Sequence, residues 1–215
     1  MILSKLFKKV FITESKQFQK TVALVGGSYK FPTIAHWYMI EQYVDKVDEV
    51  VILISDPKNP KSIRKTSNGT IITAQMAKDI FDIYINRYGF QNKVKAIISP
   101  EPSPITALFK YIDNNLSDVN VILGVSKKGG DEARFKSAEK YYADNEHINL
   151  INPIETAVEP YIGKNGQPIS ATDARNNIEN VDLIKEYLLS KLTEEDIKEV
   201  LSILGVNNLG ESLAE

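Results

Sequence analysis

The sequence lacks cysteine altogether and contains only two histidines and one tryptophan in 215 residues. Without a thiol, the chain can form no disulfide, no thiolate metal site and no covalent intermediate on cysteine. His36 and His147 are too few for a histidine-rich metal centre, so any imidazole chemistry has to use one or both of them. The formal net charge of −2 gives no reason to expect a general nucleic-acid binder.

Long apolar runs are also missing. No segment approaches the roughly 18 apolar residues that would span a bilayer. Residues 1–11 are apolar but interrupted by lysines, and they lack the apolar core and cleavage site of a secretory signal. A helix lying on a membrane surface is one interpretation of this segment; the other, which we favour, is an extra element packed on the domain. We therefore expect no membrane partner and a cytoplasmic protein.

Short β-branched runs alternate with longer segments of helical period. The predicted strands cover 21–25, 49–55, 94–99, 120–125 and 147–151. The predicted helices cover 34–44, 70–88, 103–114, 136–145, 181–192 and 194–204. This alternation predicts an α/β fold: a Rossmann-like parallel sheet with helices on both faces and a C-terminal helical segment. We expect an N-terminal extension over 1–20, an α/β domain over 21–180, and helices over 181–215 that pack on that domain.

Parallel sheets of this kind bind ligands at the carboxyl ends of their strands, near the point where the strand order switches. The segment after the first predicted strand reads Gly-Gly-Ser-Tyr-Lys-Phe-Pro-Thr-Ile-Ala-His, from Gly26 to His36. Its glycines allow a ligand to approach the backbone, and the helix that follows begins with free N–H groups that favour anions. Thr33 and His36 are three residues apart and share one face of that helix. The segment predicts a phosphate site, although an ordinary strand end followed by a capped helix would look the same.

A second segment, from Ile169 to Arg175, reads Ile-Ser-Ala-Thr-Asp-Ala-Arg. Ser170 is a good helix N-cap, and Asp173 three residues later suggests an approximate capping box. A helix starting here would point backbone N–H groups, two hydroxyls and the Arg175 guanidinium outward. That guanidinium can hold phosphate oxygens through two hydrogen bonds at once. An ordinary capped helix is again the alternative.

Together the two segments resemble the signatures of the nucleotidylyltransferase superfamily. The first is similar to the pattern G-[ST]-F-x-P-x-H-x-G-H, with Gly27 and His36 at its ends. Tyr29 stands for the phenylalanine of that pattern, Thr33 for its first histidine and Ala35 for its last glycine. Phe31 stands where the family often has proline, and the proline follows one place later at Pro32. The T-x-x-H form resembles that of eukaryotic nicotinamide mononucleotide adenylyltransferases. The second segment is similar to I-S-[ST]-T-x-x-R, and it follows about 140 residues later in the expected order.

This resemblance implies an enzyme that transfers a nucleotidyl group from a nucleoside triphosphate to a small phosphorylated acceptor and releases pyrophosphate. It implies catalytic roles for His36 and Thr33 at the α-phosphate and for Arg175 at the leaving group. The expected nucleotide-binding residues are Gly26, Gly27, Ser28, Tyr29, Lys30, Ser170, Thr172 and Lys128. The family also implies Mg²⁺, held mainly by phosphates and water; we predict no metal-ligating residues in the chain.

The identity of the substrates stays open at this point. The residues before the second segment, Gly166 to Pro168, lack the arginine-threonine-glutamate-glycine lead of many cytidylyltransferases, so ATP is favoured over CTP. Candidate acceptors are nicotinamide mononucleotide, phosphopantetheine, and sugar or alcohol phosphates. Ser126 stands where many adenylyltransferases carry an aspartate, which weakens the first of these. Three alternatives remain: a cytidylyltransferase acting on a sugar or alcohol phosphate, a nucleotide-binding sensor without catalysis, and a hydrolase of nucleotide-linked substrates. Self-association is also left open.

Overall fold

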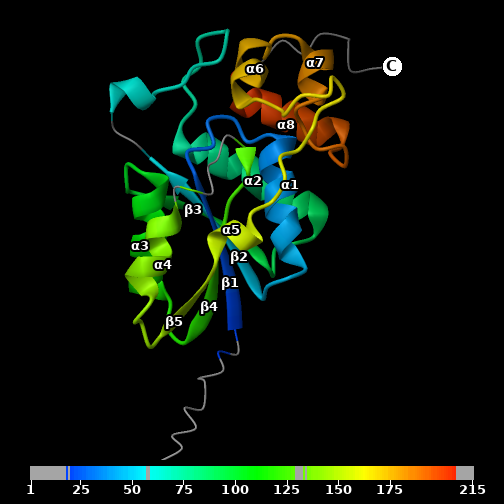
Figure 1. Ribbon diagram of the computed structural model, residues 1–215. Coiled ribbons are helices and arrows are strands. Elements are labelled where there is room, and N and C mark those ends of the chain that lie inside the picture. Colours follow the sequence, from blue (N-terminus) through cyan, green and yellow to red (C-terminus); the bar gives the residue numbers. More distant parts are fainter. Residues whose placement is uncertain (1–17, 19, 57–58, 129–132, 134, 207–215) are drawn as a thin grey trace, which may run out of the picture.

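A computed structural model describes residues 18, 20–56, 59–128, 133 and 135–206 (Figure 1). Most of the predicted extension at 1–20 therefore lies outside the described residues. The strands form one parallel sheet in the order β3-β2-β1-β4-β5. They are β1 (Lys20–Gly27), β2 (Glu49–Ser55), β3 (Val94–Ser99), β4 (Val119–Gly124) and β5 (Ile148–Ile151). The helices are α1 (Ile34–Val44), α2 (Ala74–Tyr88), α3 (Pro104–Asn115), α4 (Lys136–Tyr142), α5 (Pro153–Thr156), α6 (Ala171–Asn176), α7 (Val181–Lys185) and α8 (Glu194–Ile203), with a 3₁₀ turn, η1, at Pro60–Ser62.

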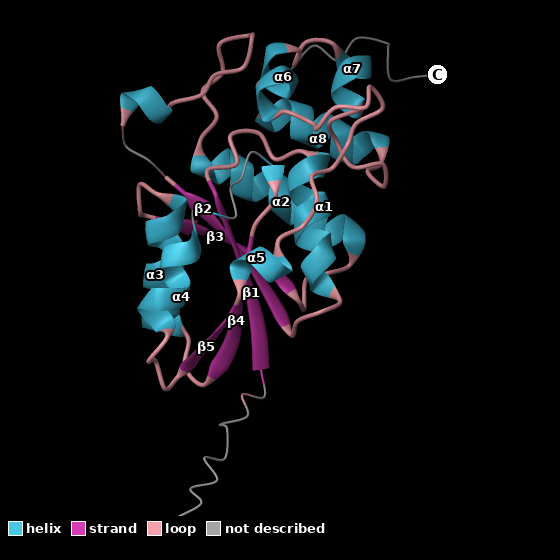
Figure 2. Ribbon diagram, in the orientation of Figure 1, coloured by secondary structure: helices cyan, strands magenta, loops and turns pink. Residues whose placement is uncertain are grey.

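Helices cover both faces of the sheet, as the alternating pattern predicts (Figure 2). Successive side chains of a strand point to opposite faces. Ala23 and Val25 of β1 belong to the core under α1 and α2, whereas Val22 and Leu24 belong to the core under α3 and α4. Burial on both faces explains why the central strands are nearly continuous apolar runs instead of alternating ones.

The strand order switches beside β1, and this positions the site. The chain builds β1, β2 and β3 outward in one direction and then returns to place β4 on the other side of β1. The carboxyl ends of β1 and β4 are adjacent, since Val25 pairs with Gly124. Gly26 keeps α3 close to this point: a Cβ at that position would lie 2.9 Å from the Leu108 side chain and 3.2 Å from the Pro104 carbonyl oxygen.

The C-terminal helices pack over α1 and α2. The apolar residues Leu188, Leu189, Val200, Leu201 and Leu204 join the core that α1 and α2 share with the sheet. Arg87 of α2 forms an ion pair with Asp196 of α8 at 2.6 Å. The exact boundaries proposed for the extension and the helical segment stay predictions. Among the described residues, no helix is long and apolar enough to cross a membrane.

Three predicted helices are longer than the observed ones by three residues or more. The helix expected from residue 70 starts at Ala74, because the Thr73 hydroxyl accepts a hydrogen bond from the Met76 N–H at 3.1 Å and caps the first turn. The helices expected to reach residues 145 and 192 end at Tyr142 and Lys185. Helix α5 was not predicted, because a single turn of four residues is too short to show helical periodicity.

Candidate active site

A cavity of about 610 Å³ opens at the carboxyl ends of β1 and β4. Its volume lies in the range of roughly 300–1,000 Å³ that is typical of small-molecule sites. Every residue that the sequence predicts for the site lines this cavity: Gly26, Gly27, Ser28, Tyr29, Lys30, Thr33, His36, Lys128, Ser170, Thr172 and Arg175. The fold therefore brings together two segments that lie about 140 residues apart in the sequence.

The turn between β1 and α1 has a constrained backbone. Tyr29 and Phe31 have φ angles of +44° and +93°, a region that side-chain-bearing residues rarely adopt. Both side chains are buried, and the Tyr29 hydroxyl donates to the Val25 carbonyl at 3.1 Å. The Tyr29 ring lies over Gly27, where a Cβ would come within 2.6 Å of it. Packing thus holds a strained turn whose glycines line the cavity, and such strain is common at functional sites.

His36 is held in one tautomer by the residue that caps its helix. The backbone N–H of Thr33 lies 3.0 Å from His36 Nδ1. Because an amide N–H can only donate, Nδ1 must accept, and the proton of the neutral ring is on Nε2. Burial, together with the positive charges of Lys128 and Arg175, lowers the pKa of His36 to about 4. At neutral pH the ring is therefore an uncharged hydrogen-bond donor beside the cavity.

Thr33 is almost completely buried, with 1% of its surface exposed. Its hydroxyl lies 3.1 Å from the same His36 Nδ1 atom. The structure therefore shows Thr33 fixing the orientation of the imidazole. Direct contact between Thr33 and an α-phosphate stays a prediction.

In the second segment, Ser170 caps α6 as expected, but through a different contact. Its Oγ accepts from the Thr172 N–H at 3.2 Å, and among the described residues no reciprocal contact from Asp173 completes a capping box. The prediction that Arg175 points outward is wrong, since only 8% of it is exposed. Its Nη1 donates to the Lys30 carbonyl at 2.6 Å and its Nη2 to the Thr172 hydroxyl at 2.9 Å.

The inward turn of Arg175 joins the two segments to each other. A guanidinium has five N–H donors, so the two internal hydrogen bonds leave others for a ligand in the cavity. Burial lowers the pKa of Arg175, and the nearby positive charge of Arg64 adds to this, although an arginine remains charged at neutral pH. The hydroxyls of Ser170 and Thr172 both act as acceptors within the protein, and neither donates its own O–H to another described residue.

The loop after β4 closes a third side of the cavity. Lys128 Nζ donates to the Ile169 carbonyl at 2.9 Å, and Ser126 Oγ accepts from the Lys128 N–H at 3.2 Å. Residues 129–131, which continue this loop in the sequence, lie outside the described part of the chain. Of the basic residues between β2 and α2, which are further candidates for phosphate binding, Arg64 lines the cavity, whereas Lys61 and Lys65 are exposed and do not.

Sequence reasoning missed one side of the cavity. Segment 159–161, with Glu159 and Tyr161, lines it together with Met39 of α1. Ile105 of α3 and Phe135, directly before α4, also line it. No motif or periodicity marks segment 159–161, because a bridge between residues 126 and 158 brings it to the end of β4. Among the described residues, no group of three or more metal-binding side chains is present.

Comparisons with known proteins agree with this architecture. No protein-family model matches the chain, and no curated protein matches its sequence. A bifunctional NMN adenylyltransferase/ADP ribose pyrophosphatase from Francisella tularensis, solved with AMP and a manganese ion, matches with a TM-score of 0.57 at 12% identity, over 91% of this chain and 52% of that one. A candidate nicotinate-nucleotide adenylyltransferase from Vibrio parahaemolyticus matches with a TM-score of 0.50 at 16% identity, over 85% of this chain and 99% of that one.

The chain spans about half the length of the Francisella protein, which has two activities in its name. At such low identities, structural similarity establishes the architecture alone. The chain has a Rossmann-like α/β fold, which it shares with these solved adenylyltransferases.

Proposed function

We propose that this chain is a nucleotidylyltransferase, which transfers a nucleotidyl group from a nucleoside triphosphate to a small phosphorylated acceptor and releases pyrophosphate. The observation that carries the proposal is the meeting of His36 and Arg175 in one cavity at the switch in strand order. The two solved structures compared above are named as adenylyltransferases, and one holds AMP. We therefore favour ATP over CTP as the nucleotide donor.

The triphosphate tail would occupy the part of the cavity lined by the second segment. Arg175 and Lys128 supply positive charge there, and Ser170 and Thr172 supply hydroxyl donors. Charge-assisted hydrogen bonds of this kind are stronger than neutral ones and suit phosphate oxygens. These groups would bind the β- and γ-phosphates and stabilise the pyrophosphate as it leaves.

In the reaction, a phosphate oxygen of the acceptor would attack the α-phosphorus, and the bond from that phosphorus to the oxygen bridging to the β-phosphate would break. Such chemistry depends on positioning and charge stabilisation and needs no covalent enzyme intermediate. His36 would donate from Nε2 to an α-phosphate oxygen, where negative charge develops. Its low pKa makes it a poor general base at neutral pH but leaves this donor in place.

Magnesium would neutralise phosphate charge in this reaction. Among the described residues, the cavity offers several hydroxyls and a single carboxylate, that of Glu159, which pairs with Lys127 at 2.5 Å. This donor set does not form an all-protein cage. It fits a Mg²⁺ ion that arrives with the triphosphate and keeps phosphate oxygens and water as its ligands.

Pyrophosphate release across a panel of acceptors tests the proposal. The panel holds nicotinamide and nicotinate mononucleotides, phosphopantetheine, and sugar and alcohol phosphates, each with ATP and with CTP. We expect pyrophosphate with at least one acceptor, and faster release with ATP. Nucleotide binding without release for every acceptor would favour a sensor, and nucleoside monophosphate as the product would favour a hydrolase.

Replacing His36 with alanine tests the role of the imidazole. Loss of one donor to developing charge typically lowers kcat by about 100- to 1,000-fold. The matched control is His147→Ala, which removes an exposed imidazole that pairs with Asp118 outside the cavity. A folded His36→Ala enzyme with the turnover of the His147→Ala control would rule out the proposed role.

A further inference from the structure

All but one of the charged described residues that line the cavity are cationic. Its charged lining residues in the described part of the chain are Lys30, Arg64, Lys128, Arg175 and Glu159. A carboxylate repels phosphate groups, so Glu159 is unsuited to the part of a nucleotide that the basic residues would hold. If it contacts the nucleotide, it must do so at a hydrogen-bond donor, because an ionised carboxylate can only accept.

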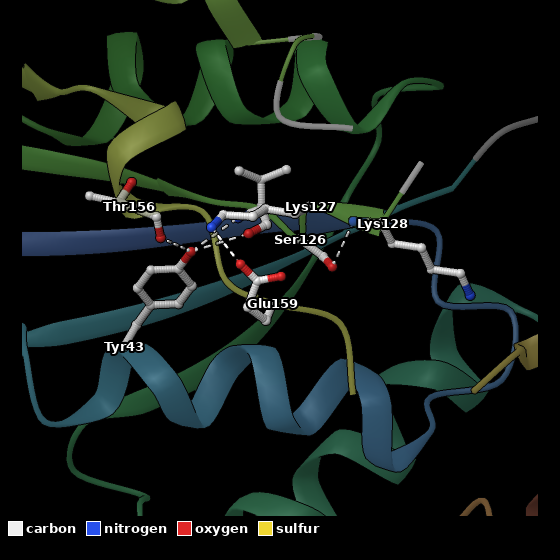
Figure 3. A network of polar contacts seen from close by, with 7 residues as sticks. Tyr43, Ser126, Lys127, Lys128, Thr156 and Glu159 are labelled. Carbon is white, nitrogen blue, oxygen red and sulfur yellow. Dashed lines mark hydrogen bonds and ion pairs between the residues drawn. The ribbon is translucent and has the colours of Figure 1, made fainter. Parts of the chain in front are cut away.

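The segment that carries Glu159 is tied firmly to the end of β4 (Figure 3). The Val158 N–H donates to the Val125 carbonyl at 2.9 Å, and the Lys127 N–H donates to the Val158 carbonyl at 2.9 Å. Tyr43 of α1 adds a cross-link, because its hydroxyl donates to the Thr156 carbonyl at 2.9 Å and accepts from the Val125 N–H at 3.2 Å. Glu159 thus follows a segment held by backbone hydrogen bonds beside the switch point.

One of the two oxygens of the Glu159 carboxylate is already paired within the protein. Lys127 Nζ lies 2.5 Å from Oε1, which fixes the direction of the side chain. No described residue donates a hydrogen bond to Oε2. The side chain is 70% exposed, so Glu159 stands at the rim of the cavity with one oxygen available to a ligand.

We infer that Glu159 binds the ribose of the nucleotide, by accepting hydrogen bonds from its 2′- or 3′-hydroxyl. This inference rests on the proposed function, which places a nucleoside triphosphate in the cavity. Ribose hydroxyls are the donors nearest to the phosphates, and an acidic residue that binds the ribose is a recurrent solution in Rossmann folds. Glu159 therefore selects ribonucleotides over deoxyribonucleotides.

Dissociation constants for ATP, 2′-deoxyATP and 3′-deoxyATP, measured by calorimetry, test this inference. Removing the carboxylate also removes a charge that repels the phosphates, and this changes the binding of all three nucleotides alike. The informative quantity is therefore the ratio of the dissociation constants of a deoxy analogue and ATP. We expect the wild-type chain to bind ATP about tenfold tighter than at least one deoxy analogue, a modest factor because Glu159 is exposed. In Glu159→Ala the ratio should fall to about one.

Glu186→Ala is the matched control, since Glu186 is an exposed glutamate that pairs with Lys164 outside the cavity. It should keep the wild-type ratio. An unchanged ratio in Glu159→Ala overturns the inference. So does a variant in which only the ratio of dissociation constants for ATP and inosine triphosphate changes, because that result would indicate contact with the base. Failure of the wild-type chain to bind any nucleotide would overturn the proposed function as well. Equal dissociation constants of the wild-type chain for ATP and both deoxy analogues would overturn the inference alone.

Discussion

At the scale of single residues, burial decides what His36 and Arg175 can do. Burial keeps the imidazole of His36 neutral, and the Thr33 N–H leaves its proton on Nε2. Arg175 cannot lose its charge in the same way, so it uses the Lys30 carbonyl and the Thr172 hydroxyl as hydrogen-bond partners. The site therefore combines one neutral donor with one permanent cation.

The lowered pKa of His36 predicts a dependence of stability on pH. The folded-state pKa of about 4 lies below the unfolded value of about 6.5, so the unfolded chain takes up the proton first as the pH falls. This contribution is fully present above about pH 6.5 and is lost between about pH 6.5 and about pH 4. Its size is on the order of 3 kcal/mol.

Urea unfolding at about pH 7 and about pH 4.5 measures this contribution. The wild-type chain should lose on the order of 2–3 kcal/mol more than His36→Asn between these two conditions. A control variant, His147→Asn, changes a histidine outside the cavity and should resemble the wild type. Equal losses for the wild type and His36→Asn would show that His36 is not buried in its neutral form.

At the scale of elements, the turn between β1 and α1 is the most constrained part of the site. Its conformation depends on two residues with positive φ, Tyr29 and Phe31, and on the missing side chain at Gly27. The Tyr29 ring also meets the His36 ring edge-on at 5.2 Å between centroids. A side chain added at Gly27 should therefore displace the Tyr29 ring, and the displaced ring should shift His36.

We predict that Gly27→Ala destabilises the fold and weakens nucleotide binding. The new methyl group would lie 2.6 Å from the Tyr29 ring, so the ring or the turn must move. Overpacking of this kind costs about 1–3 kcal/mol, which urea unfolding would detect. In the double variant Gly27→Ala/Tyr29→Ala the clash is gone, so its loss should be smaller than the sum of the two single losses. Strict additivity would contradict this account.

At the scale of the whole molecule, the cavity is where four parts of the chain are held together. Arg175 joins the second segment to the turn after β1, and Lys128 joins the loop after β4 to Ile169. The Ser67 N–H donates to the Arg175 carbonyl at 2.9 Å and so joins the segment before α2 to the second segment. A ligand in the cavity would contact all of these parts and should stabilise the fold as a unit.

ATP should accordingly raise the melting temperature. At a ligand concentration of about one hundred times Kd, binding contributes about 2.7 kcal/mol. For a chain of this size that corresponds to a rise of roughly 5–10 °C, measurable by scanning fluorimetry. At the same ATP concentration the rise should be smaller in Arg175→Lys, because one ammonium cannot replace the forked guanidinium that joins Lys30 and Thr172. No rise in the wild-type chain would contradict the assignment of the cavity to ATP.

Much of the architecture was determined by the sequence alone. Periodicity predicted the five strands and the parallel α/β class, and it placed both ends of α1, β2 and β3 correctly, because burial on one or both faces leaves a local pattern. The two segments that carry the resemblance also predicted which residues line the cavity, since each is a short continuous stretch beside a helix start.

Only the tertiary structure decided how those residues meet. The hydrogen bond from Arg175 to Lys30 joins positions 145 residues apart, and no local pattern could indicate that the guanidinium turns inward. Glu159 reaches the cavity through the bridge between residues 126 and 158, in a segment without motif or periodicity. Periodicity records which side of an element is buried, whereas the position of one element against another depends on packing between distant parts of the chain.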